Sequence, residues 1–207
     1  MKEIKMLWDN LTYNRMSEEF SRIYRDNFWV CGSGLGSLPD RTEEYVKFLL
    51  DILKDKDITS VLDYGCGDWQ FSRHIDWPVP YKGVDIVESV INNNKQKYEK
   101  EGICFEVVGK NFEMPHADLI ICKDVMQHLP NQIVQDLFSE MKKRCRYLLI
   151  TNDVISSATG DCEIGGWREY DILKFLDQKS IDSLKWYSYD GVTDLKTTVL
   201  IAGDLTS

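Results

Sequence analysis

The sequence predicts an α/β fold in which a mixed sheet of seven strands has helices on both faces. Short apolar runs alternate with amphipathic segments, the pattern of parallel strands joined by crossover helices. The last two runs are separated only by Asp190–Lys196, a connection too short for a parallel crossover. We therefore expect five βα units, then an antiparallel pair whose last strand inserts beside the fifth. The expected strands are Ser60–Tyr64, Tyr81–Ile86, Ile103–Val108, Ala117–Lys123, Arg146–Thr151, Leu184–Tyr189 and Thr197–Ala202.

The spacing of apolar residues also predicts helices. After Pro130, a residue suited to a first helical turn, apolar side chains recur on one helical face at Ile133, Val134, Leu137, Phe138 and Met141. A helix over about Arg41–Lys54 has the same pattern. The 207 residues fit one domain. We expect residues 1–56 to form an N-terminal helical cap with a Gly-Ser loop, and residues 57–207 to form the core.

Composition excludes several classes of protein. The formal net charge of −9 argues against nucleic acid as the main partner, because phosphate binding needs a basic face. No run approaches the roughly 20 apolar residues of a membrane-spanning helix, and the first ten residues lack a signal peptide's apolar run. The six cysteines form no Cys-x-x-Cys pair, which argues against a zinc knuckle. We expect a reduced, cytoplasmic protein.

The most informative segment is Asp63-Tyr64-Gly65-Cys66-Gly67-Asp68. A buried strand runs into two glycines, after which a helix is expected; glycines allow a sharp turn and a close approach to a ligand. Twenty residues after Gly65 the next strand ends in Asp85, where a carboxylate can accept hydrogen bonds from both ribose hydroxyls. A nicotinamide-type fingerprint needs glycine or alanine at position 70, where this chain has Gln70.

This segment resembles motif I of class I S-adenosylmethionine (SAM) dependent methyltransferases, whose Rossmann-like sheet has seven strands. The resemblance extends from Ser60 to Gly203 and implies SAM as the cofactor. It implies that the methionine part contacts the loop and Lys123, that Asp85 and Ile86 flank the ribose, and that Asn111 and Phe112 lie beside the adenine. The residues so implied are Asp63, Gly65, Cys66, Gly67, Asp85, Ile86, Asn111, Phe112 and Lys123. One departure is Trp69, at a position where the family frequently has a third glycine.

A second glycine-rich segment, Gly32-Ser33-Gly34-Leu35-Gly36-Ser37, precedes the predicted helix at about Arg41–Lys54. Its backbone donors at Ser33 and Gly34 can close over a carboxylate such as the methionine end of SAM. It resembles a segment of methyltransferases associated with surface-polysaccharide genes. The alternative is a connector between helices.

Polar residues follow the fourth and fifth predicted strands, which should be neighbours. Asp124 and His128 follow the fourth, and Asp153 ends the fifth. A histidine oriented by a carboxylate is a workable general base for a hydroxyl acceptor. This arrangement is similar to natural-product sugar O-methyltransferases, which implies His128, Asp153 and Asp124 as catalytic residues. The alternative for His128 is a capping or packing role.

A metal site competes with this interpretation. Asp124, Asn152 and Asp153 offer oxygen ligands of the kind Mg²⁺ or Mn²⁺ prefers. Their positions are similar to those of the divalent-ion ligands of catechol-type O-methyltransferases.

The segment after the fifth strand commonly forms a wall of the acceptor pocket in this fold. Here it contains Trp167, Arg168, Tyr170 and Asp171. The two rings can stack on a sugar, and the two charged groups can bind hydroxyls or an anion. The alternative is that both rings anchor the loop to the core.

These observations predict an O-methyltransferase that acts on a hydroxyl of a sugar or glycan. Three alternatives remain. The acceptor can instead be a phenolic or other small molecule, with or without a metal; the chain can be a non-catalytic SAM-binding subunit; or it can be a nicotinamide-dependent oxidoreductase, which Gln70 and the acidic loop disfavour.

Overall fold

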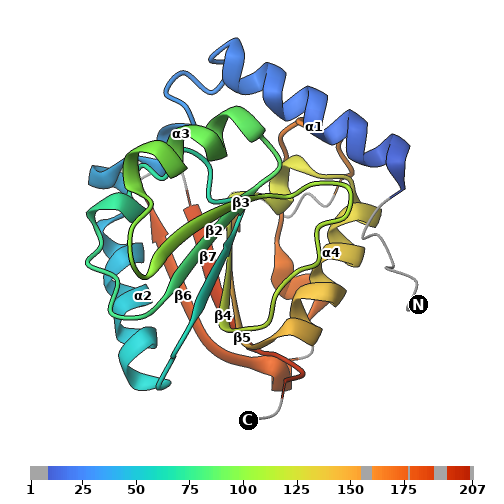
Figure 1. Cartoon of the computed structure of the whole chain (residues 1–207). Helices are drawn as coiled ribbons and strands as arrows, with labels where there is room; N and C mark the ends of the chain where they lie inside the picture. The colour runs from blue at the N-terminus through green and yellow to red at the C-terminus, as the bar shows by residue number, and fades with distance from the viewer. Residues whose placement is uncertain (1–8, 155–159, 177, 189–194, 206–207) are drawn as a thin grey trace, which may run out of the picture.

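The computed structural model describes residues 9–154, 160–176, 178–188 and 195–205. Within them, seven strands form one sheet in the order β3-β2-β1-β4-β5-β7-β6, with helices on both faces (Figure 1). The strands are β1 (Val61–Tyr64), β2 (Tyr81–Asp85), β3 (Ile103–Val107), β4 (Ala117–Lys123), β5 (Cys145–Asp153), β6 (Ile181–Ser188) and β7 (Leu195–Ala202).

The direction of the strands confirms the predicted mixed sheet. β1 to β5 pair in parallel, whereas β7 lies antiparallel between β5 and β6. The prediction was wrong about where the last strand begins. β7 begins at Leu195 rather than Thr197, and this extension pairs Lys196 with Asp153 of β5. Tyr189, the predicted end of the sixth strand, lies outside the described residues.

Within the described residues, four α-helices pack around the sheet. They are α1 (Asn10–Arg25), α2 (Glu43–Asp55), α3 (Glu88–Tyr98) and α4 (Asn131–Arg144). α1 begins where the Asp9 side chain accepts a hydrogen bond from the Thr12 backbone at 2.7 Å, an N-cap. Figure 1 shows α1 running past one end of the sheet, far in sequence from the loops it approaches.

The alternation of side chains along the strands produces two hydrophobic cores. Ile120, Leu148 and Ile150 share one core with residues of α1 and α4. Leu119 and Leu149 point to the other face and pack with residues of α2. The predicted helical face of α4 is confirmed, because Ile133, Val134, Leu137 and Met141 are buried.

The helix expected directly after the glycine loop is absent from the described chain, which has only a 3-10 turn at Ser72–His74 between β1 and β2. Pro78 and Pro80 close this short connection, and proline lacks the N–H that a helix interior requires. Aromatic packing takes its place: the Phe71 ring lies 5.5 Å from the Tyr45 ring of α2 in a T-shaped arrangement.

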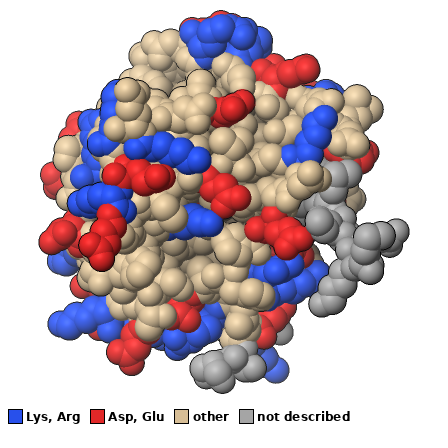
Figure 2. Space-filling view, viewed as in Figure 1, with Lys and Arg blue, Asp and Glu red and all other residues tan. Residues whose placement is uncertain are grey.

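No helix among the described residues is long and apolar enough to span a membrane. Basic and acidic side chains are interspersed over the face shown in Figure 2. All six cysteines are free thiols.

Candidate active site

The loop after β1 is a tight turn that only glycine permits at two positions. Gly65 and Gly67 have φ of 78° and 53°, in the left-handed region. A Cβ at Gly65 would collide with Cγ2 of Val125. The Gly65 and Cys66 N–H groups both donate to the Val84 carbonyl, at 2.8 and 3.0 Å, which ties the loop to β2.

Trp69 has a φ of 60°, in the left-handed region that glycine adopts most readily. Its ring is buried and lies 5.1 to 5.6 Å from the rings of Tyr81, Tyr98 and Phe105. Aromatic packing therefore compensates for a backbone conformation that a bulky residue rarely adopts. The departure from the family pattern leaves the turn intact.

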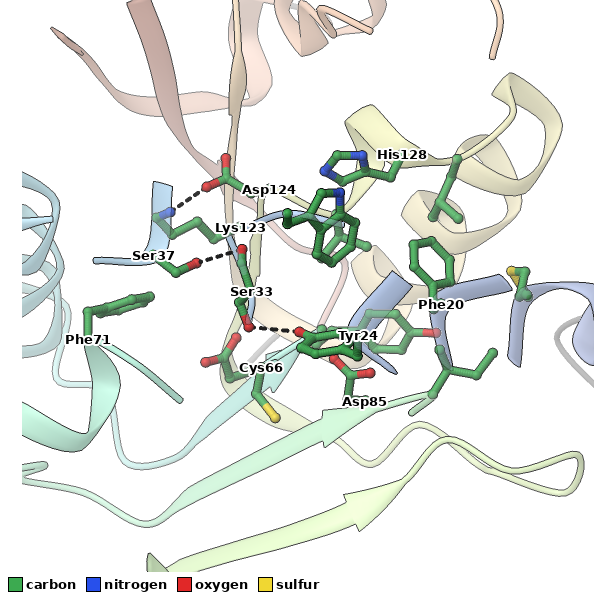
Figure 3. A pocket seen from close by; sticks show the side chains of 18 residues that line it. Phe20, Tyr24, Ser33, Ser37, Cys66, Phe71, Asp85, Lys123, Asp124 and His128 are labelled. Carbon is green, nitrogen blue, oxygen red and sulfur yellow. Dashed lines mark hydrogen bonds and ion pairs between the residues drawn. The ribbon is translucent and has the colours of Figure 1, made fainter. Parts of the chain in front are cut away.

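Two buried carboxyls lie at the ends of β1 and β2. Asp85 accepts hydrogen bonds from the N–H groups of Gly67 (3.1 Å) and Val87 (2.9 Å). Asp63 accepts one from the Tyr81 hydroxyl at 2.6 Å. Burial raises the pKa of each carboxyl to about 6, because desolvation disfavours the charged form. Both carboxyls line the cleft beneath the loop, and Figure 3 shows Asp85 there.

The N-terminal Gly-Ser segment is bound to the β1 loop rather than acting as a free connector. The Ser33 hydroxyl donates to the Asp68 carboxylate at 2.5 Å and accepts from the Asp68 N–H at 2.9 Å. The Tyr24 hydroxyl of α1 lies 2.7 Å from Ser33 Oγ (Figure 3). Gln70 donates to the carbonyl of Cys31 as well. Segments far apart in sequence thus form one wall of the cleft.

The cleft has an apolar wall and an acidic floor. Among the described residues, α1 contributes Met16, Phe20 and Tyr24. The predicted cofactor residues Asp63, Gly65, Cys66, Asp85, Ile86, Lys123 and Ser33 line it, and Gly67 lies within the same loop. Gly34 lines an adjoining pocket instead. Asn111 is exposed, and neither it nor Phe112 is among the described residues that line the cleft.

Lys123 at the end of β4 joins the Gly-Ser segment to the sheet. Its ammonium donates to the Gly36 carbonyl at 2.8 Å and pairs with Asp124 at 2.5 Å. It also lies 5.5 to 5.6 Å from the ring centroids of Phe71 and Tyr45. Burial lowers the pKa of Lys123, and Asp124 opposes that shift.

His128 lies where the cleft meets the adjoining pocket, and it lines both. Its Nδ1 lies 2.7 Å from the Gly166 carbonyl, and since a carbonyl oxygen can only accept, Nδ1 carries the proton. Nε2 is then the unprotonated nitrogen. Burial lowers the pKa of His128 below its ordinary value, so the imidazole is neutral at neutral pH.

The predicted pairing of Asp153 with His128 is not what the structure contains. Asp153 Oδ2 accepts from Gln127 Nε2 at 2.8 Å and from Trp167 Nε1 at 3.2 Å, and Oδ1 pairs with Lys196 at 2.6 Å. The histidine is oriented by a backbone carbonyl instead. Asp153 organises the wall of the adjoining pocket.

The predicted metal ligands do not fit a divalent ion. The Lys196 ammonium pairs with both Asp124 and Asp153, between the two carboxylates. Asn152 alternates with Asp153 along β5 and so points to the opposite face of the sheet. Among the described residues, no group of three or more His, Cys, Asp or Glu side chains is arranged to hold a metal.

Asp124 has a φ of 58° and is surrounded by charge. Burial opposes its ionisation, but Lys123 and Lys196 outweigh that effect and lower the pKa of Asp124 to about 2. Two lysines and two aspartates therefore form one compact charge cluster where the carboxyl ends of β4 and β5 meet the amino end of the antiparallel β7.

The adjoining pocket opens beside His128 and combines polar side chains with apolar surface. The described residues that line it include Trp29, Arg41, Gln127, Asp153, Trp167 and Lys196. Trp29 lies 4.9 Å from the His128 ring, centroid to centroid. The two cavities share Trp29, Ser33, Asp124 and His128, so they lie side by side.

Of the predicted acceptor residues, only Trp167 lines this pocket, with 55% of its surface exposed. Arg168 is buried and donates to the carbonyls of Leu129 and Gly160 at 2.7 and 2.8 Å, which fixes the loop. Tyr170 is buried in the core and stacks on Phe175. Asp171 caps the next 3-10 turn by accepting from the Leu173 N–H at 3.1 Å.

Sequence reasoning missed Arg41, Trp29 and Lys196, and it did not place Gln127 in the acceptor pocket. Gln127 immediately precedes His128, and its 3-10 turn, Met126–His128, directs both side chains toward the site. Prediction of a longer final strand would have placed Lys196 in the sheet. Leu195 extends the alternation of Thr197 and Val199 toward the N-terminus. Nothing in the sequence signals Arg41 or Trp29.

The order of the sheet and the glycine loop at the end of β1 define a class I methyltransferase. Residues 38–186 match the family model described as a methyltransferase domain, which is more than half of the chain. The chain therefore belongs to this family and is a SAM-dependent methyltransferase. No curated protein matches the chain in sequence.

Solved structures share the fold at low sequence identity. N-methyltransferase NodS from Bradyrhizobium japonicum WM9, in complex with S-adenosyl-L-homocysteine (SAH), has a TM-score of 0.62 and 15% identity, over 95% of this chain and 100% of that one. Magnesium protoporphyrin IX methyltransferase from Synechocystis PCC 6803 with bound SAH has a TM-score of 0.59 and 17% identity, over 79% of this chain and 84% of that one. The methyltransferase domain of bacterial CtHen1 has a TM-score of 0.57 and 15% identity, over 77% and 98%.

The residues of the cleft fit SAM. The Asp85 carboxylate suits ribose hydroxyls, while Asp63 provides an acidic group near a ligand with an ammonium and a sulfonium. Phe20 and Ile86 provide the apolar surface that a purine requires.

Proposed function

We propose that the protein is an O-methyltransferase that transfers the methyl group of SAM to a hydroxyl of a sugar or glycan. The observation that carries this proposal is the hydrogen bond from His128 Nδ1 to the Gly166 carbonyl, at the junction of the two cavities. A hydroxyl is a poor nucleophile until its proton is removed, so the reaction needs a base at this point.

His128 meets the requirements of that base. Its Nε2 is unprotonated and its pKa is lowered by burial, so it can take the acceptor's hydroxyl proton at neutral pH. The carboxylates of Asp124 and Asp153 favour the imidazolium that results, because opposite charges nearby stabilise the charged form. Bound SAM supplies an activated methyl carbon, and the walls of the two cavities align acceptor and donor.

The lining of the adjoining pocket supports a sugar as the acceptor. Trp167 presents an exposed ring, onto whose face the C–H groups of a sugar can stack. Gln127, Asp153 and Arg41 offer both donors and acceptors to hydroxyl groups. A phenolic acceptor would need less of this polar lining, and a non-catalytic SAM-binding subunit would need no base at the junction.

The test is methyl transfer from labelled SAM to a panel of sugars and phenols, with wild type and His128→Ala. We expect His128→Ala to lower turnover by about 10²–10⁴-fold, the usual contribution of a general base. Its affinity for SAH, measured by calorimetry, should stay near that of wild type. His116→Ala, which removes an exposed histidine, serves as the matched control.

The pH profile adds an independent readout. The wild-type rate should rise with pH through a midpoint below the ordinary histidine pKa, because only the neutral imidazole accepts a proton. Near-normal turnover of His128→Ala would overturn the general-base proposal. Turnover of phenols alone would overturn the sugar acceptor.

A further inference from the structure

We infer that Lys196 is the resident cation of this active site: its ammonium takes the place of a divalent metal between Asp124 and Asp153 and positions the acceptor pocket. The inference deepens the proposed function, but its first test is metal binding, which requires no acceptor.

The placement of Lys196 follows from the sheet. β7 pairs antiparallel with β5, with Lys196 opposite Asp153. The Lys196 ammonium contacts Asp153 Oδ1 at 2.6 Å and also pairs with Asp124 Oδ1. Its side chain is only 2% exposed. The last strand thus brings a buried positive charge to the carboxyl edge of the two strands that hold the acids.

The carboxylates of Asp124 and Asp153 require a cation between them. The side chains of Asp124 and Asp153 are 14% and 17% exposed, so water screens their mutual repulsion poorly. Metal-dependent sites resolve such repulsion with a divalent ion held by oxygen ligands. Here Lys123 pairs with one oxygen of Asp124 and Lys196 with the other. Each oxygen of Asp124 is therefore already paired with an ammonium, which repels a divalent cation from the same carboxylate.

Lys196 also acts on the acceptor side of the site. It lines the adjoining pocket together with Gln127, His128 and Trp167. The Asp153 carboxylate that it holds accepts hydrogen bonds from both Gln127 and Trp167. Lys196 is therefore a positioning residue, which keeps two pocket side chains in place through Asp153.

The charged and titratable groups that face Lys196 are Asp124, Asp153, Lys123 and His128. Burial disfavours its ammonium, but Asp124 and Asp153 outweigh that effect and raise its pKa. The ammonium therefore remains charged over the whole range in which His128 titrates.

The first experiment measures binding of Mn²⁺ alone by electron paramagnetic resonance. We expect wild type and Lys196→Arg to leave the Mn²⁺ signal that of the free ion. Lys196→Met should bind Mn²⁺, since it frees an oxygen of each of two neighbouring carboxylates. The double variant Lys196→Met/Asp124→Asn removes one of these carboxylates and should lose the site again. Circular dichroism verifies that each variant is folded, and SAH affinity does so for the two single variants of Lys196.

Two results would overturn the inference. One is binding of Mn²⁺ to the wild-type site; the other is a folded Lys196→Met that binds no Mn²⁺.

The second experiment uses turnover. Activity of wild type should withstand a chelator, whereas Lys196→Met should raise the KM for the acceptor about tenfold or more and leave SAH affinity nearly unchanged. Lys196→Arg should restore much of the acceptor affinity. Loss of wild-type activity in chelator would contradict the inference, as would a Lys196→Met enzyme with a normal acceptor KM. Failure of His128 as the base would leave the Mn²⁺ result standing.

Discussion

The hydroxyl of Ser33 both donates to the carboxylate of Asp68 and accepts from its backbone N–H, across 35 positions of sequence. One small side chain therefore joins the N-terminal segment to the loop that shapes the cofactor cleft. Because the Ser33 proton is given to Asp68, the Tyr24 hydroxyl is the donor in its own contact with Ser33, and α1 is joined to the same chain of hydrogen bonds.

Removal of that hydroxyl should weaken cofactor binding. Ser33→Ala removes the hydroxyl donor to Oδ1 of Asp68, whose Oδ2 keeps the hydrogen bond from Gln70 Nε2 at 3.0 Å. Hydrogen bonds to charged groups contribute about 1.5–3 kcal/mol. We expect the Kd for SAH, measured by calorimetry, to rise by about 10- to 100-fold. Ser139→Ala removes an exposed serine of α4 and should leave the Kd unchanged. An unchanged Kd in Ser33→Ala would show that the segment does not hold the cleft in shape.

Recognition of the cofactor should depend on the ionised form of Asp85. Its pKa is raised by burial to about 6 in the folded protein. Ribose hydroxyls donate best to a carboxylate, so affinity for SAH should increase as the pH rises through about 6 and then level off. Asp85→Asn should lose about 1–3 kcal/mol of binding and flatten this dependence at least in part. NAD is the comparison ligand, and tight NAD binding without SAH binding would refute the cofactor assignment.

The two buried acids of the cleft, Asp63 and Asp85, lower the free energy of unfolding as the pH rises, whereas SAH affinity increases with pH. Each has a folded pKa above its ordinary value, so the folded state binds more protons than the unfolded state between about pH 4 and 6. Their contribution to the unfolding free energy is fully present below about pH 4 and is lost as the pH rises through about 6. Thermal denaturation without ligand should record this loss, and Asp85→Asn should reduce it. If Asp85→Asn lost as much stability as wild type over this pH range, Asp85 would not be a source of the loss.

The turn after β1 should not tolerate a side chain at Gly65. Gly65→Ala combines a φ of 78° with a collision against Val125. We expect a loss of about 1–3 kcal/mol of stability for the strained backbone, together with reduced SAH affinity. Gly109→Ala is the control, because a Cβ there meets nothing within 4 Å. Equal effects of the two substitutions would mean that the turn can relax.

The fold was predictable because each element has a local cause in the sequence. The apolar alternation of β4 and β5 and the short 190–196 connection fixed the mixed sheet, and Asp63, Gly65 and Asp85 located the cleft. The exact bounds of the strands were not predictable. β7 begins two residues before the predicted start, so Lys196 lies in a strand opposite Asp153 and not in a loop.

The partners of side chains were the least predictable part of the site. His128 is oriented by the carbonyl of Gly166, and every residue has a carbonyl, so the sequence does not mark this one. Arg168 and Tyr170 have the residue types of a binding wall, yet the fold of their loop directs both inward. Such contacts depend on loop conformation, which no periodicity encodes.

The wall of the cofactor cleft that α1 and the Gly-Ser segment form has a consequence for the turnover rate. Met16, Phe20, Tyr24 and Ser33 all belong to one continuous stretch of chain that lines one wall of the cleft. Movement of this stretch would widen the path by which a spent cofactor dissociates, and such motions set the turnover rate of many enzymes. The hydrogen bonds of Tyr24 and Ser33 that strengthen ligand binding also slow ligand dissociation. The enzyme with the highest turnover would therefore not be the one with the highest cofactor affinity.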